Sequence, residues 1–179
     1  MNKIGPPEFH ELTEYVYQSN AIEGISAEDH GPGDPLFDQH LQAARLVLVG
    51  LWHPLAIHGI LMQDLLLASD VGQYRSVSVW IGGHPAVHPA SIMYRMRDWE
   101  SMVEAGLQMW ERPEEWAWRM HDHFECIHPF RDGNGRTGRL VLNALRLRQN
   151  LPWLTVHTGE EQQAYYRHIQ RYRNTVFGP

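Results

Sequence analysis

The chain has 179 residues, which is enough for one domain with a hydrophobic core of its own. Its formal net charge of −6 argues against a protein that binds nucleic-acid phosphates, and its single cysteine excludes an internal disulfide framework. No apolar run approaches the roughly 20 residues that cross a bilayer, so no membrane span is expected. The first residues show no apolar core of a secretory signal, so we expect a cytoplasmic protein.

Helical patterns alternate with breaks that are rich in glycine and proline. Apolar spacing predicts helices over residues 8–18, 37–52, 54–67, 91–110, 114–127, 137–149 and 160–173. Residues 26–35 and 129–135 are expected to be loops, because Gly, Pro, Asp and Asn dominate them. Residues 75–81 alternate in part and are rich in β-branched side chains, and Gly82 and Gly83 follow them, which favours a short β-hairpin or extended flap over residues 75–88. The predicted fold class is mostly α, a compact helical bundle with one β-hairpin.

The helix expected over residues 137–149 is the most apolar in the chain. Leu140, Val141, Leu142 and Leu145 leave it few polar positions. A helix that is apolar on most sides belongs in the centre of a bundle. We therefore expect the other helices to surround it.

The segment that carries the chemistry is His-Pro-Phe-Arg-Asp-Gly-Asn-Gly-Arg-Thr-Gly-Arg, residues 128–139. It leads into the start of that apolar helix, where backbone N–H groups are unpaired and the helix dipole favours an anion. The glycines Gly133 and Gly135 let the backbone approach a phosphate closely. Arg136 and Arg139 are three residues apart and share a helix face, so a polyphosphate is the expected ligand.

Two further side chains of this segment suit a reaction on a phosphate. Asp132 supplies an oxygen ligand for Mg²⁺, which binds through one or two carboxylates together with phosphates. His128 is the natural general base near neutral pH. Each feature alone also fits a plain turn or a surface pair of arginines. Their combination within twelve residues favours a nucleotide site.

This segment resembles the signature of the Fic family, His-Pro-Phe-x-Asp/Glu-Gly-Asn-Gly/Lys-Arg-x-x-Arg, at every specified position. The resemblance extends from about Asp34 to Arg173 and includes the sequence Gly-Gln-Tyr-Arg at residues 72–75. It implies a helical fold with a β-hairpin flap, and the transfer of AMP from ATP to a Ser, Thr or Tyr hydroxyl of a target protein. The implied roles are a general base at His128, Mg²⁺ binding by Asp132, an anion nest at Gly133, Asn134 and Gly135, and triphosphate binding by Arg136 and Arg139.

Position 135 bears on the type of reaction. Family members with lysine there resemble the Doc type, which transfers a phosphoryl group, whereas Gly135 is associated with AMP transfer. A phosphotransferase, a hydrolase that removes AMP from a target, and a nucleotide sensor without turnover remain open as alternatives.

A second motif precedes this region at Ser19-Asn20-Ala21-Ile22-Glu23-Gly24, directly after the first predicted helix. By itself it reads as a helix end with a glycine turn. It also matches the inhibitory pattern of the Fic family, Ser/Thr-x-x-x-Glu-Gly/Asn, which implies that Glu23 pairs with Arg139 and keeps it from the γ-phosphate. The expected organisation is an N-terminal inhibitory helix and loop over residues 1–33 and a catalytic domain over 34–179, forming one compact unit.

The remaining candidates are weaker or concern partners. His121, His123 and Cys126 do not share one helix face, so a structural role is favoured over a metal site. The flap at residues 75–88 is expected to dock an extended segment of the target protein through main-chain hydrogen bonds. No nucleic-acid or membrane partner is expected, and the state of self-association stays open.

Overall fold

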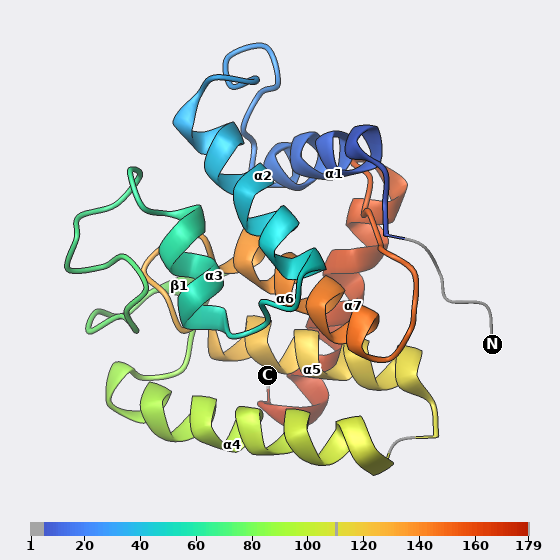
Figure 1. Ribbon diagram of the computed structural model, residues 1–179. Coiled ribbons are helices and arrows are strands. Elements are labelled where there is room, and N and C mark those ends of the chain that lie inside the picture. The colour runs from blue at the N-terminus through green and yellow to red at the C-terminus, as the bar shows by residue number, and fades with distance from the viewer. Residues whose placement is uncertain (1–5, 110, 179) are drawn as a thin grey trace.

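The computed structural model describes residues 6–109 and 111–178, and within them it contains helices and one small sheet (Figure 1). The helices are α1 (Phe9–Ile22), α2 (Pro35–Leu48), α3 (Pro54–Leu61), α4 (Pro89–Met109), α5 (Pro113–Ile127), α6 (Asn134–Arg148) and α7 (Glu160–Val176). The antiparallel strands are β1 (Trp80–Ile81) and β2 (His84–Pro85). The predicted fold class, a helical bundle with a β-hairpin, is therefore confirmed.

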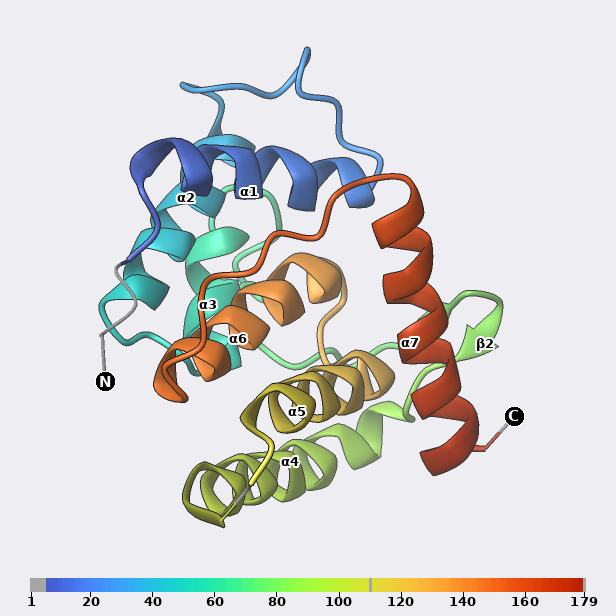
Figure 2. The same cartoon turned by 90° about the vertical axis from the view of Figure 1, so that its right-hand side faces the viewer.

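The apolar helix α6 lies at the centre of the bundle, as its sequence predicted. In Figure 2 it runs between α1, α2 and α3 on one side and the pair α4 and α5 on the other. Leu140, Val141 and Leu145 are completely buried, and they belong to one core cluster with side chains of α1 to α5. This position lets residues at the start of α6 face several elements at once.

The starts of the helices follow ordinary capping chemistry. Pro35, Pro54 and Pro113 each occupy the first helical turn, where the missing N–H of proline costs nothing. The side chain of Asp34 also accepts a hydrogen bond from the N–H of Leu36 and thereby caps α2.

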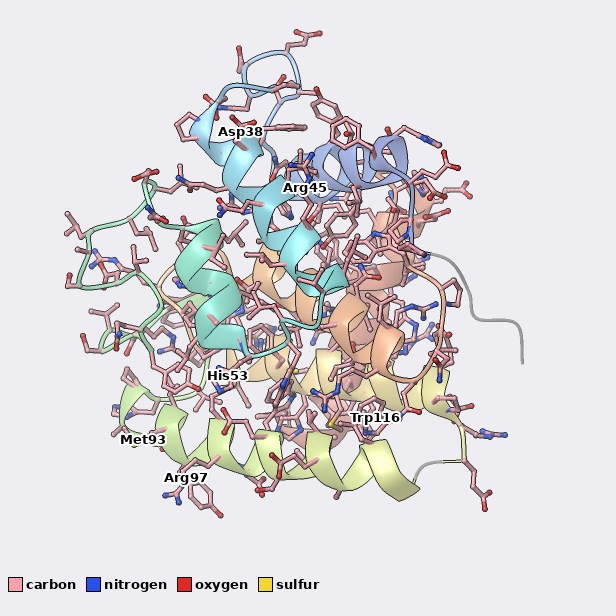
Figure 3. The ribbon with its side chains drawn as sticks, viewed as in Figure 1. Asp38, Arg45, His53, Met93, Arg97 and Trp116 are labelled. Carbon is pink, nitrogen blue, oxygen red and sulfur yellow. The ribbon has the colours of Figure 1, made fainter. Side chains whose placement is uncertain are left out.

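Close packing of α4 on α5 depends on a glycine. A Cβ at Gly106 would lie only 1.8 Å from Nε1 of Trp116, so no larger residue fits unless Trp116 moves. Figure 3 shows Met93 and Arg97 on the other side of α4, pointing away from the bundle. One face of α4 therefore packs on α5 and the other faces outward.

Several predicted boundaries were wrong. Helix α1 continues to Ile22, so Ser19 to Ile22 form its last turn instead of following it. Helix α6 begins at Asn134 and not at Thr137, because Gly133 already turns the chain with a φ of 72°. The helices predicted to end at Trp52 and Leu67 end at Leu48 and Leu61, and the predicted end at Trp110 lies outside the described residues.

The hairpin is shorter than the predicted flap. Only Trp80–Ile81 and His84–Pro85 pair as strands, with Gly82 and Gly83 at positive φ in the turn between them. Within the described part of the chain, no helix is both long and apolar enough to cross a membrane.

Candidate active site

A cavity of about 520 Å³ opens where segments far apart in the sequence meet. The end of α1, the flap, the end of α5, the loop before α6, the first turns of α6 and the middle of α7 all contribute to its wall. The lining includes Glu23, Trp80, Glu125, His128, Asp132, Gly133, Asn134, Gly135, Arg139 and Tyr166. Seven of the nine predicted site residues thus line one cavity; the exceptions are Arg136 and Ser19.

The loop before α6 is held in shape by two buried side chains. The Asn134 amide accepts a hydrogen bond from the N–H of Phe130 and donates one to the carbonyl of the same residue, both at 2.8 Å. His58 stacks on the Phe130 ring with centroids 3.8 Å apart. Its Nδ1 accepts a hydrogen bond from the N–H of Gly72, so Nε2 carries the proton and donates to the Asp132 carbonyl.

These contacts fix the loop so that the N-terminus of α6 lies at the cavity. The first helical hydrogen bond runs from the N–H of Thr137 to the Gly133 carbonyl. The N–H groups of Asn134, Gly135 and Arg136 therefore have no partner within the helix, as in any helix first turn. Because the Asn134 side chain is used within the loop, its backbone N–H is the group that can contribute to an anion nest.

His128 is positioned by an unusual backbone conformation. It ends α5 in the left-handed region, with φ 52° and ψ 63°. Its ring Nδ1 lies 3.2 Å from the backbone carbonyl of Glu125, and a carbonyl only accepts, so Nδ1 carries the ring proton. Burial lowers the pKa of His128 to about 4, which leaves Nε2 unprotonated and available as a base at neutral pH.

Arg75 braces the flap against this loop. Its guanidinium donates to the carbonyls of His128, Val77, Val87 and Ile127 at 2.6–3.4 Å. Its backbone N–H also bonds the Pro129 carbonyl at 2.9 Å. One buried side chain thus joins the flap to the turn that presents His128.

We expect Arg75→Ala to lower the free energy of unfolding by about 2–3 kcal/mol, because buried carbonyls lose their donors. Urea denaturation followed by circular dichroism measures this change. The matched control is Arg97→Ala, at an exposed position on the outward face of α4 (Figure 3), which should leave the urea midpoint unchanged. Equal midpoints for both variants would contradict the bracing role.

The predicted contact between Glu23 and Arg139 is present. Oε1 of Glu23 lies 2.7 Å from Nη2 of Arg139, whose side chain is only 3% exposed. Arg139 also donates to Oγ of Ser19 at 2.9 Å and to the Ser19 carbonyl at 2.8 Å. A Cβ at Gly135 would lie 2.3 Å from Oε1 of Glu23, so Gly135 leaves the room that this carboxylate occupies.

Of the two predicted triphosphate-binding arginines, only Arg139 lines the cavity. Arg136 does not line the cavity, and its Nη2 lies 3.6 Å from Sδ of Met62. Among the described residues, Nε and Nη1 of Arg136 have no hydrogen-bond partner although the side chain is buried. Residues three apart on a helix are separated by about 60° around its axis, which lets two long side chains end in different places; of this pair, Arg139 lines the cavity and Arg136 packs beside Met62.

Asp132 is an exposed residue on the cavity wall, and its Oδ1 accepts a hydrogen bond from the N–H of Gly133. No group of three or more His, Cys, Asp or Glu residues among those the structure describes could hold a metal ion. A single carboxylate still fits Mg²⁺, because this ion keeps several waters and binds jointly to phosphates.

The histidines and the cysteine before the loop have structural contacts. His121 donates from Nδ1 to the Gly138 carbonyl, so Nε2 accepts from the Tyr165 hydroxyl at 3.1 Å. His123 contacts the Tyr172 hydroxyl at 2.9 Å. Burial raises the pKa of the Cys126 thiol to about 12 and makes it unreactive.

Sequence reasoning missed three residues at the site: His58 and Arg75, which hold the loop and the flap, and Glu125, which lines the cavity. Glu125 stands three residues before His128 at the end of a predicted helix, and that spacing could have drawn attention to it. The contacts of His58 and Arg75 cross 74 and 53 residues, so only the tertiary structure reveals them.

Residues 50–145 match the sequence profile of the Fic/DOC family, which covers more than half of the chain and includes the whole loop from His128 to Arg139. The chain belongs to the Fic/DOC family. The matched region excludes Ser19 and Glu23, so the match does not extend to the predicted inhibitory motif.

Curated relatives of this Fic domain include several that are named protein adenylyltransferase Fic. The one from Aedes aegypti is 32% identical over 99 residues, and the one from Drosophila grimshawi is 31% identical over 103 residues. These alignments span 55% and 58% of the chain, but only 20% and 21% of the relatives. The chain thus matches about a fifth of the length of these proteins.

Solved structures share the fold over nearly the whole chain. A Fic-domain signalling protein from Bacteroides thetaiotaomicron superposes with a TM-score of 0.75 at 20% identity, covering 90% of this chain and 71% of the other. A Fic family protein from Desulfovibrio desulfuricans gives a TM-score of 0.63 at 26% identity, covering 96% of this chain and 58% of the other. Both comparisons include elements outside the matched region.

Proposed function

We propose that this Fic-domain chain is an autoinhibited protein adenylyltransferase, which transfers AMP from ATP to a Ser, Thr or Tyr hydroxyl of a target protein. The observation that carries the proposal is the meeting of His128, the first turn of α6 and Arg139 in one cavity. A general base that lies beside an anion-binding helix N-terminus suits the attack of a hydroxyl group on a phosphate. The names of the curated relatives support AMP as the transferred group.

Each of these cavity residues has a separate role in the proposed transfer of AMP. Nε2 of His128 takes the proton of the hydroxyl, whose oxygen then forms a bond to the α-phosphorus. The bond from that phosphorus to the pyrophosphate oxygen breaks, and pyrophosphate leaves. The N–H groups at the start of α6 face the α-phosphate charge, and Arg139 faces the terminal phosphate, so charge that develops in the transition state meets fixed dipoles and a cation.

Asp132 is the residue that would hold Mg²⁺. When bound, this ion neutralises charge on the α- and β-phosphates. Asp132 accepts the hydrogen bond of the Gly133 N–H and lies beside the anion nest, so it also orders the loop on which the phosphates rest.

Autoinhibition is supported by the hydrogen bonds that join the end of α1 to the Arg139 guanidinium. The Arg139 guanidinium donates hydrogen bonds to Ser19 and Glu23, so a terminal phosphate must displace Glu23 before Arg139 can bind it. Burial alone lowers the pKa of Arg139, yet the facing Tyr165 and Glu23 raise it overall, and the guanidinium stays charged.

Helix α7 holds both the inhibitory segment and the flap. The Tyr166 hydroxyl donates to the Ile22 carbonyl at 3.1 Å, next to Glu23. Arg173 donates to the carbonyls of Pro85 at 2.9 Å and Ile81 at 3.4 Å. We place the target protein on the flap, where the two short strands leave an edge for an extended segment. A second copy of the chain is one such target.

A cytoplasmic location is part of the proposal. It is supported by the lone Cys126, which is buried and unpaired, as in chains that carry no disulfides.

The experiment incubates the Glu23→Gly variant with ATP, Mg²⁺ and a cell lysate and identifies modified peptides by mass spectrometry. We expect an adenylyl group on a hydroxyl side chain. A phosphoryl group would instead show a phosphotransferase. Loss of adenylyl groups from previously modified protein would show a hydrolase, and unmodified peptides with ATP binding intact would show a nucleotide sensor.

A further inference from the structure

The C-terminal turn of α5 places a second carboxyl directly behind His128. Oε2 of Glu125 lies 3.8 Å from Nδ1 of His128, and the backbone carbonyl of the same residue accepts the Nδ1 proton at 3.2 Å. We infer that Glu125 is a positioning residue: it fixes the His128 ring, and as a carboxylate it stabilises the imidazolium that forms when Nε2 takes the hydroxyl proton. This inference rests on the proposed function.

The Glu125 side chain is a buried part of the cavity wall. It lines the cavity although it is only 7% exposed, and among the described residues its Oε1 has no hydrogen-bond partner. A Cβ at Gly138 would lie 2.0 Å from this oxygen, so only glycine leaves space for the carboxyl. A buried polar group without a partner destabilises a fold, which favours a role in the reaction over a role in packing.

Charges around Glu125 determine when it ionises. Burial raises its pKa to about 8, with further increases from Glu23 and Asp122, while Arg139 opposes the shift. The other groups that face this region are His128 from the loop, Tyr165 and His168 from α7, and Arg75 from the flap, whereas Asp98 and Arg95 of α4 face His123.

Glu23 therefore acts on Glu125 as well as on Arg139. While Glu23 occupies the site, its negative charge favours the protonated form of Glu125, which cannot pair with an imidazolium. When Glu23 leaves, one of the charges that raise the pKa of Glu125 is removed, and ionisation moves to lower pH. The carboxylate then lies behind a ring that receives a proton on its opposite side, as in other carboxylate–histidine pairs.

The test compares Glu125→Gln with its parent in the Glu23→Gly background. The substitution keeps the shape and removes the charge. We expect kcat to fall by about tenfold, which is less than the 10²–10⁴-fold contribution of a general base itself, while the KM for ATP stays unchanged. In the parent, kcat/KM should rise with pH up to the pKa of Glu125, below about 8 once Glu23 is gone, and Glu125→Gln should lack this rise.

A second measurement does not depend on activity. The ¹⁵N signals of the His128 ring, assigned by their loss in His128→Asn, should shift in the wild type as Glu125 titrates near pH 8 and should not shift there in Glu125→Gln. The matched control is Asp122→Asn, a buried carboxyl of the same helix that pairs with His168 instead of His128. It should keep the parental kcat and still show an inflection, at a lower pH because Asp122 no longer raises the pKa of Glu125.

The outcomes separate the two hypotheses. If Glu125→Gln keeps the parental kcat and pH profile, or if the His128 signals show no inflection in the wild type, the positioning role is overturned. If Glu23→Gly transfers no AMP while the inflection is still lost in Glu125→Gln, the proposed reaction fails and the positioning of His128 by Glu125 stands. Glu125→Asp, which retains a carboxyl, should recover part of the lost kcat.

Discussion

Replacing His128 by alanine should reduce AMP transfer by about 10²–10⁴-fold, the usual contribution of a general base. ATP affinity should stay nearly unchanged, because the phosphate contacts come from the start of α6 and from Arg139. Initial rates of transfer and calorimetric ATP binding, both in the Glu23→Gly background, check these two expectations.

A second substitution, His128→Asn, distinguishes loss of the base from loss of the fold. His128 has a φ of 52°, a conformation that costs an alanine about 1–2 kcal/mol but that asparagine tolerates better. His128→Asn should therefore be as inactive as His128→Ala and more stable. If transfer persists in both variants, His128 is not the base; if both lose ATP binding and fold together, its role is structural.

Glu23→Gly should raise the rate of transfer by about a hundredfold. If Glu23 keeps the site closed 99% of the time, the closed state is favoured by about 2.7 kcal/mol, and its removal relieves that amount. The Glu23 side chain is 36% exposed, so its pairing with Arg139 falls below the roughly 3–5 kcal/mol lost when a fully buried pair is broken. Initial rates of self-modification or target modification at saturating ATP measure the effect.

Two control variants belong to this experiment. Glu28→Gly removes an exposed carboxylate five residues further along the chain and should leave the rate unchanged. Arg139→Ala should stay slow even in combination with Glu23→Gly, since the terminal phosphate then lacks its partner. If Glu23→Gly and the wild type transfer AMP at the same rate, the autoinhibition claim is wrong.

Local chemistry made much of the fold predictable. The apolar run in α6 indicated the central helix, and Pro54 marked the start of α3. The resemblance of residues 19–24 to the family's inhibitory pattern indicated Glu23 as the partner of Arg139, although the motif was placed after α1, whereas Ser19 to Ile22 form its last turn. That boundary was missed because the pattern of apolar residues fades where polar side chains of a helix turn toward a buried cation.

Contacts between distant segments could not be predicted. Nothing in the sequence indicates that the Arg75 guanidinium binds four carbonyls, or that the Arg136 side chain turns toward Met62 instead of the cavity. The direction of a long side chain depends on which neighbours leave space for it. The burial of Glu125 likewise depends on Gly138 of another helix.

Parallel reactions of the Glu23→Gly variant with ATP labelled at the α- or the γ-phosphate test the central claim most directly. We predict that the α-label becomes covalently attached to protein, that the γ-label is released as pyrophosphate, and that adding His128→Asn abolishes attachment. Attachment of the γ-label, or of neither label while ATP still binds, would contradict the assignment of this cavity to AMP transfer.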